Sequence, residues 1–167
     1  MIMNATIFTK SIKSLYILTC FLFLGMGSLV AQSHSYSTDD SMIALNGYSS
    51  VSYIDDGKAQ LGKKEYKATH DGLTYYFVNK RQLEMFKANP AKYKPQYGGW
   101  CAFAVSLAGK FRPEPKSFRI VDGKLYMFTV NVEGDFVKVW EKEGKGKHIA
   151  QANKNWRSMA KFKTFTP

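Results

Sequence analysis

Two Asp-Gly dipeptides constrain the fold of this chain more than any other feature. Asp71-Gly72 and Asp122-Gly123 each join two short segments in which apolar and polar residues alternate. Asp-Gly readily takes the positive φ angles of a type I′ turn, the tight connection that suits two antiparallel strands. We therefore predict two β-hairpins, the first with strands over residues 65–70 and 73–78.

Alternation along a strand assigns the side chains of each hairpin to two faces, so each hairpin has one apolar face to bury. The first turn pairs His70 with Leu73, which places His70 on the apolar face. Tyr76 is the one ring of its strand that we expect to face outward or toward a groove. The other members of the predicted inward faces are Ala68 with Tyr75 and Tyr66 with Phe77 in the first hairpin, and Phe118, Ile120, Leu125 and Met127 in the second.

Helices are predicted to cover these faces. Asn79 can cap a helix over residues 80–88, and Pro90 ends it because the residue before proline is pushed out of the helical conformation. The sequence contains no internal repeat, so we predict a small single domain of the α+β class. Two further helices are predicted from apolar spacing, over residues 132–143 and 149–160. Residues 102–107 fit a helix or a strand, and their glycine boundaries favour the helix.

The N-terminus has the pattern of a secretory signal peptide. Lys10 and Lys13 precede an apolar run over residues 15–30, which ends at Ala31 before polar residues. We expect cleavage after Ala31, with an uncleaved membrane anchor as the alternative. The predicted boundaries are residues 1–31 for the signal peptide, 32–41 for a disordered leader, 42–160 for the domain and 161–167 for a tail.

Cys101 is the cysteine that remains after this cleavage, because Cys20 lies within the signal peptide. It follows Gly98-Gly99 and Trp100, so we expect it directly after a tight turn. Three interpretations stay open for its thiol: a core residue, a contact to a metal ion or ligand, and redox or intermolecular disulfide chemistry.

The two histidines of the predicted domain lie in different environments. His70 lies on an apolar hairpin face, where a hydrogen-bonded core histidine is favoured over a metal ligand. His148 begins the last predicted helix among lysines, and we expect it to be exposed to solvent.

The chain is strongly basic, with a formal net charge of +11. Such a field can attract an anionic envelope surface. The lysines are scattered among acidic residues over most of the chain, so specific nucleic-acid binding is not expected. The oligomeric state stays open.

The residues around the two turns also carry a family resemblance. Residues 72–77 and 95–106, together with Phe86, Pro90 and Tyr93, resemble an exported YHS-domain protein. The resemblance implies a small treble-clef-like module. Further matching segments extend it over nearly the whole predicted mature chain: Asn46-Gly47-Tyr48, residues 122–126 and residues 153–156.

The resemblance also bears on metal binding. Metal-handling members of this family place cysteines just after the aromatic strand and on the next helix, where this chain has Val78 and Gln82. A closed site of several thiolates is therefore excluded by ligand count. Cys101 remains, with His70 or a methionine such as Met42 or Met85 as its partner, and soft sulfur and imidazole ligands suit Cu(I) better than structural zinc.

Signatures of common enzymes, such as a nucleophile elbow or a phosphate-binding glycine loop, are absent from the sequence. We therefore expect an exported binding module, periplasmic or secreted, rather than an enzyme, with a metal ion or small ligand as its partner. Two alternatives stay open: a thiol redox enzyme that uses Cys101, and a non-catalytic interaction domain with a buried cysteine. The predicted site holds copper through Cys101 and His70 and is shaped by Gly98, Gly99, Trp100, Tyr97 and Tyr76.

Overall fold

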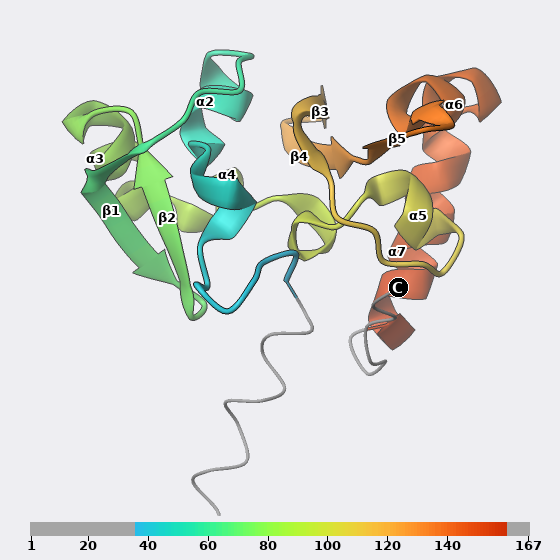
Figure 1. Cartoon of the computed structure of the whole chain (residues 1–167), viewed down its shortest axis with the longest axis horizontal. Coiled ribbons are helices and arrows are strands. Elements are labelled where there is room, and N and C mark those ends of the chain that lie inside the picture. The colour runs from blue at the N-terminus through green and yellow to red at the C-terminus, as the bar shows by residue number, and fades with distance from the viewer. Residues whose placement is uncertain (1–35, 160–167) are drawn as a thin grey trace, which may run out of the picture. The chain divides into compact units, whose positions relative to one another are not determined.

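Short helices and two-stranded hairpins alternate along the chain in the computed structural model, which describes residues 36–159 (Figure 1). The predicted signal peptide, residues 32–35 and residues 160–167 lie outside the described residues. In the first half of the described chain, the elements are the 3₁₀ turn η1 (Ala44–Gly47), α2 (Ser50–Asp55), β1 (Lys63–His70), β2 (Leu73–Phe77), α3 (Lys80–Ala88) and α4 (Pro90–Tyr93).

The second half contains a longer series of elements. They are the 3₁₀ turn η2 (Gln96–Gly99), α5 (Ala102–Ser106), β3 (Glu114–Val121), β4 (Lys124–Phe128), β5 (Val130–Asn131), β6 (Gly134–Asp135), α6 (Phe136–Glu143) and α7 (Lys145–Met159). The described residues thus form an α+β domain of six α-helices and three antiparallel hairpins, which confirms the predicted class. None of these helices combines the length and the apolar composition that a membrane crossing requires.

The first hairpin forms at the predicted turn. Asp71 and Gly72 have φ angles of 50° and 78°, and His70 pairs with Leu73 as expected. The predicted pairing of Tyr66 with Phe77 is wrong, because the register shifts between Lys63 and Lys67 and Lys63 becomes the partner of Phe77. A bulge of this kind cannot be read from alternation, since it breaks the alternation itself.

The second hairpin also forms at its predicted turn, with Phe118 opposite Met127 and Ile120 opposite Leu125. The expectation that only one face is buried is wrong for β4. Tyr126, the neighbour of Leu125 and Met127 on the opposite face, is buried as well. The reason is that the second face is covered by residues of α6 and α7, among them the ring of Trp140.

The predicted helix over residues 80–88 is confirmed as α3. The side chain of Asn79 accepts a hydrogen bond from the Gln82 N–H, as an N-cap should, and Pro90 begins the separate helix α4. The predicted short helix after Cys101 is confirmed as α5. These local signals agree with the structure because the contacts that decide them span few residues.

The predicted start of α6 is wrong. The chain forms a third hairpin, β5–β6, before the helix begins at Phe136, and Val132 lies fully exposed at the hairpin tip. Asp135 caps α6, since its carboxylate accepts from the Val137 N–H and from the Ser117 hydroxyl. α7 also begins earlier than predicted, at Lys145.

One backbone pattern occurs twice in the described chain. In η1, Leu45 and Asn46 have φ angles of 53° and 52°, and in η2, Tyr97 and Gly98 have φ angles of 53° and 60°. The third residue of each turn is a glycine with a φ of 83°. The segment before each turn then lies parallel to the second strand of the following hairpin, through the bridges Ile43–Thr74 and Pro95–Leu125.

Each turn is followed by a fully buried residue, a short helix and an Asp-Gly hairpin. The buried residue is Ser49 in the first half and Cys101 in the second. Its main-chain N–H donates to a distant carbonyl in both halves, to Gln60 at 2.8 Å and to Phe111 at 3.1 Å. The sequence shows no repeat because the shared features are backbone angles and turn chemistry, while the side chains differ.

The interior consists of three clusters of buried side chains. One belongs to the first half and surrounds Phe77 and Phe86, and one belongs to the second half and surrounds Cys101 and Trp140. The third joins the halves, where the Tyr53 ring meets Phe118 edge-on at a centroid distance of 4.8 Å. The Tyr53 hydroxyl also donates to the Pro115 carbonyl at 2.7 Å.

Packing begins before residue 42, where the sequence places the start of the domain. Ser37 and Thr38 are buried, and the Ser37 N–H donates to the Gly98 carbonyl at 2.8 Å. Arg112 donates to the Thr38 carbonyl at 3.1 Å. This part of the predicted leader therefore lies on η2 of the second half.

Candidate binding site

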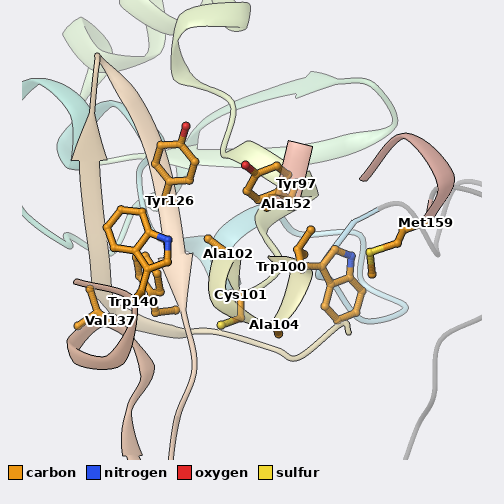
Figure 2. Packing of buried hydrophobic residues seen from close by; sticks show 12 residues of the cluster. Tyr97, Trp100, Cys101, Ala102, Ala104, Tyr126, Val137, Trp140, Ala152 and Met159 are labelled. Carbon is orange, nitrogen blue, oxygen red and sulfur yellow. The ribbon is translucent and has the colours of Figure 1, made fainter. Parts of the chain in front are cut away.

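Cys101 is a core residue of the second half. Its exposed fraction is 0%, and it belongs to a cluster that contains Trp100, Tyr126 and Trp140 (Figure 2). The main chain turns as predicted before it, through η2. A thiol in this position is out of reach of solvent, so it behaves as a small apolar side chain.

His70 lies in a different part of the fold. Its ring is partly exposed, meets Phe86 edge-on at 6.1 Å, and has Nε2 3.6 Å from the Asp71 carboxylate. Phe86 belongs to the cluster of the first half, whereas Cys101 belongs to that of the second. The structure therefore does not bring the two predicted copper ligands into one cluster.

Metal coordination needs several donors at one point. Within residues 36–159, no three His, Cys, Asp or Glu side chains gather where they could hold one ion. Cys101 and His70 as placed here do not fit a shared copper site. Copper binding stays a prediction, which an anaerobic Cu(I) titration of the wild type and of Cys101→Ser would check.

Four of the predicted site-shaping residues build the turn before Cys101, and all of them except the half-buried Gly98 lie in the interior. Tyr97 and Trp100 are buried, and the Tyr97 hydroxyl donates to the Asn153 side chain at 3.0 Å. Gly98 and Gly99 supply the positive φ angles of the turn. These residues join η2 to α7 and position the core of the second half.

Tyr76 is placed as predicted, with its ring toward a hollow in the surface. A shallow, open pocket of about 350 Å³ lies over η1, and Tyr76 forms part of its wall. Leu61 contributes an apolar side chain that is 64% exposed. The residues that line the pocket are Asp39, Ser41, Ile43, Asn46, Gly47, Leu61, Gly62, Lys64 and Tyr76.

Two glycines contribute main chain to the wall of this pocket. A Cβ on Gly62 would lie 2.5 Å from the main-chain carbon of Tyr76, so no larger residue allows this approach to β2. Gly47 has a φ of 83°, and a Cβ there would lie 3.4 Å from the Tyr76 ring and 3.7 Å from Leu61. The main chain of Gly47 therefore lines the pocket, and a side chain at this position would occupy part of its space. The two glycines are joined by a hydrogen bond from the Gly62 N–H to the Gly47 carbonyl at 2.9 Å.

The lining of the pocket carries opposite charges. The Ser41 hydroxyl and main-chain N–H both donate to the Asp39 carboxylate, and these hydrogen bonds hold the pKa of Asp39 below its usual value. Lys64 brings an ammonium group, and Asn46 brings an amide. The pocket thus offers apolar surface from Ile43, Leu61 and Tyr76 beside separate positive and negative groups.

Sequence reasoning missed a buried polar network centred on Gln82, which we call the Gln82 network. The Gln82 Oε1 accepts from the Ser49 hydroxyl at 2.8 Å and from the Val78 N–H at 3.1 Å. Its Nε2 donates to Ser52 Oγ at 3.0 Å and to the Asp56 carboxylate at 2.9 Å. Val78 and Gln82 occupy the two positions where the family resemblance implies metal-binding cysteines. In this chain the Gln82 side chain accepts a hydrogen bond from the Val78 main chain.

The prediction that His148 is exposed is wrong. Its exposed fraction is 4%, because its ring packs against Phe103 at 5.1 Å between α5 and α7. The Ser106 hydroxyl donates to the Phe103 carbonyl at 2.7 Å, and Ser106 Oγ lies 2.9 Å from His148 Nδ1. Nε2 lies 3.2 Å from a Glu143 carboxylate oxygen.

Serine, histidine and glutamate are the residue types of a hydrolytic triad, but here their roles differ. A nucleophilic serine must give its proton to the histidine. The proton of Ser106 is instead committed to a main-chain carbonyl, and both Ser106 and His148 are buried. This cluster joins α5 to α7.

Comparison of this chain with protein-family models, with curated proteins and with solved structures found no match. The assignment of a site therefore depends on the geometry of the described residues alone.

Proposed function

We propose that this protein is an exported, non-catalytic binding module of the YHS type, and that the pocket over η1 is its ligand site. The observation that carries the proposal is the hollow beside the Tyr76 ring, which Gly47 lines without a side chain and which Gly62 lines where it lies against the main chain of β2. Export and YHS membership are supported by the sequence patterns described above.

The chemistry of the interior favours binding over catalysis. The Cys101 thiol is fully buried, whereas a thiol nucleophile needs access to its substrate. The Ser106 hydroxyl is bonded to a carbonyl of its own helix. Neither of these groups is a candidate for attack on a substrate in the structure described.

The lining of the pocket defines the kind of ligand. Ile43, Leu61 and the Tyr76 ring offer contact to an apolar group, while Asp39 and Lys64 offer opposite charges to polar groups. Small-molecule sites commonly combine apolar walls with a few polar groups that fix orientation. We therefore expect a ligand with an apolar part and at least one polar or charged group.

A fragment screen by protein-observed NMR tests this proposal on the full chain. Fragments that carry an apolar ring and a polar group are expected to shift the amide signals of Asn46, Gly47, Leu61 and Tyr76. Leu61→Glu should abolish these shifts at the same fragment concentration. Shifts that avoid the pocket residues, or none at all across the screen, would contradict the proposal.

Leu107→Glu provides a matched control variant. Leu107 is 66% exposed at the end of α5, compared with 64% for Leu61, and it does not line the pocket. Both variants exchange one exposed leucine for a carboxylate, so they should unfold at similar temperatures. Only Leu61→Glu should lose fragment binding.

A further inference from the structure

We propose that the pocket over η1 receives an extended polypeptide segment, which binds partly through its main chain. This inference rests on the proposed function of the same pocket and names the class of its ligand. It comes from a comparison of η1 with η2, because the equivalent place on η2 already holds an extended segment of this chain.

The segment at η2 is Ser37-Thr38. The Ser37 N–H donates to the Gly98 carbonyl at 2.8 Å, and the Thr38 carbonyl accepts from Arg112 at 3.1 Å. Both residues are buried there. The passing chain is thus held through main-chain groups at two successive residues, of which Ser37 bonds to η2 and Thr38 bonds to the Arg112 side chain.

The space above the third glycine of each turn shows that the two places correspond. A Cβ on Gly99 would lie 3.8 Å from Ser37 Cβ and 3.6 Å from the Pro95 ring. A Cβ on Gly47 would point at Tyr76, Leu61 and Ile43, which all line the pocket. Because Ile43 and Pro95 are equivalent positions, the Tyr76 and Leu61 side chains that line the pocket stand over Gly47 where Ser37 stands over Gly99.

Each turn also presents a main-chain carbonyl at its second positive-φ residue, which can accept a hydrogen bond from an extended segment. Asn46 occupies in η1 the position that Gly98 occupies in η2, with similar φ angles. No main-chain N–H of residues 36–159 donates to the Asn46 carbonyl, whereas the Gly98 carbonyl accepts from Ser37. A bound segment would supply the equivalent donor at Asn46, as in recognition of extended peptides by main-chain pairing.

The side chains around the pocket set the chemistry of the segment. The ligand residue nearest Gly47 must be small, since Tyr76 and Leu61 already stand 3.4 Å and 3.7 Å from the place of a Gly47 Cβ. A neighbouring apolar or aromatic residue would contact Tyr76 and Leu61. The ligand is therefore an extended peptide with a small residue next to an apolar one.

Selection from a displayed library of linear heptapeptides against the full chain tests this inference. Selected peptides are synthesised and their dissociation constants are measured by calorimetry. We expect Leu61→Glu to weaken binding at least about tenfold, and Leu107→Glu to change it less than about twofold. Peptides that bind Leu61→Glu as tightly as the wild type would overturn the inference, because they would be bound elsewhere.

N-methylation of each amide of a selected peptide adds a test that does not depend on a protein variant. Methylation of one amide, that of the small residue itself, should abolish binding, because it removes the donor to the Asn46 carbonyl. Equal tolerance of methylation at every position would overturn main-chain recognition. The amide shifts of Asn46 and Gly47 in the wild type locate the peptide directly.

The two proposals fail in different ways. If fragments shift the pocket signals but the library yields no peptide that does so, the peptide inference is overturned and the ligand site stands. If neither fragments nor peptides reach the pocket residues, both proposals are overturned.

Discussion

The two halves of the described chain share a backbone but differ in how they fill its interior. Ser49 and Cys101 occupy equivalent places, directly before α2 and α5, and both are fully buried. The Ser49 hydroxyl accepts from the Ser52 N–H at the start of its helix and donates to Gln82. The Cys101 side chain makes no such cap and packs among apolar residues.

This difference follows from what covers each half. In the second half, α6 and α7 bring Trp140 and Ala152 over the hairpin and over Cys101, so a thiol suits the position. In the first half, α3 presents Gln82 to Ser49, so a hydroxyl suits it. The same turn, helix and hairpin can therefore be completed with a polar network or with an apolar core. Only the first half leaves the pocket over its 3₁₀ turn open.

The largest effect is expected from removal of the Gln82 network. Gln82→Leu keeps a side chain of similar size but leaves the Ser49 hydroxyl and the Val78 N–H buried without their partner. Each unsatisfied buried group costs roughly 1–3 kcal/mol, so we expect the free energy of unfolding to fall by about 3 kcal/mol. Urea denaturation followed by circular dichroism measures this change.

Gln151→Leu is the control for this prediction. Gln151 is exposed on α7 and bonds only to Asn155 there, so its replacement should change the free energy of unfolding by less than about 0.5 kcal/mol. If Gln82→Leu were equally mild, the first half would not depend on its polar network, and the contrast between the halves would disappear.

An intermediate effect is expected from Cys101→Ser, which places the residue of the first half in the second. The hydroxyl would enter an apolar cluster, and we expect a loss of about 1–2 kcal/mol in the free energy of unfolding. Cys101→Ala, which adds no polar group, should cost less. Denaturant titration of the three proteins under one set of conditions compares them.

The opposite order would be informative. If Cys101→Ser were more stable than Cys101→Ala, the hydroxyl would be capping α5 as Ser49 caps α2, and the two positions would be interchangeable. Thiol labelling of the wild type provides an independent check. Cys101 should react with a thiol reagent only as fast as the protein opens, because its exposed fraction is 0%.

The parts of the fold that could be predicted from sequence are those fixed by near neighbours. Asp71-Gly72 determines its hairpin turn, and Asn79 and Pro90 determine the ends of α3, all within a few residues. The start of α6 could not be predicted in this way. Val132 continues the helical spacing of apolar residues, but Asp135 caps the helix with help from Ser117, which is distant in sequence.

The candidate site depended on distant contacts, so sequence could supply only part of it. Tyr76 was predicted to face outward or toward a groove because side chains alternate along its strand. The other walls come from segments that tertiary structure brings to it, such as Ile43 and Leu61. The same limit explains why sequence paired His70 with Cys101, which belong to different clusters.

The smallest effect is expected at the hairpin turns, where Asp71 of the first half contacts the basic side chains of Lys94 and His70. The Asp71 carboxylate contacts Lys94 at 2.6 Å, and this hydrogen bond lowers the pKa of Asp71. Asp71→Asn preserves the turn, because Asn-Gly also favours type I′ geometry. The pair is about one-third exposed, so its loss should cost only about 0.2–1 kcal/mol at pH 7.

The pH dependence identifies the origin of this effect. A carboxyl group whose pKa is lower in the folded state stabilises the fold above its unfolded value of about 4, and this contribution is lost as the pH falls through the folded value. The stability difference between wild type and Asp71→Asn should therefore be present at pH 7 and absent at about pH 2. In the second half, Asp122 has no recorded ion-pair partner among the described residues, so Asp122→Asn should leave stability nearly unchanged at both pH values. Equal losses from the two variants at pH 7 would mean that the turn itself, common to both halves, is what asparagine disturbs.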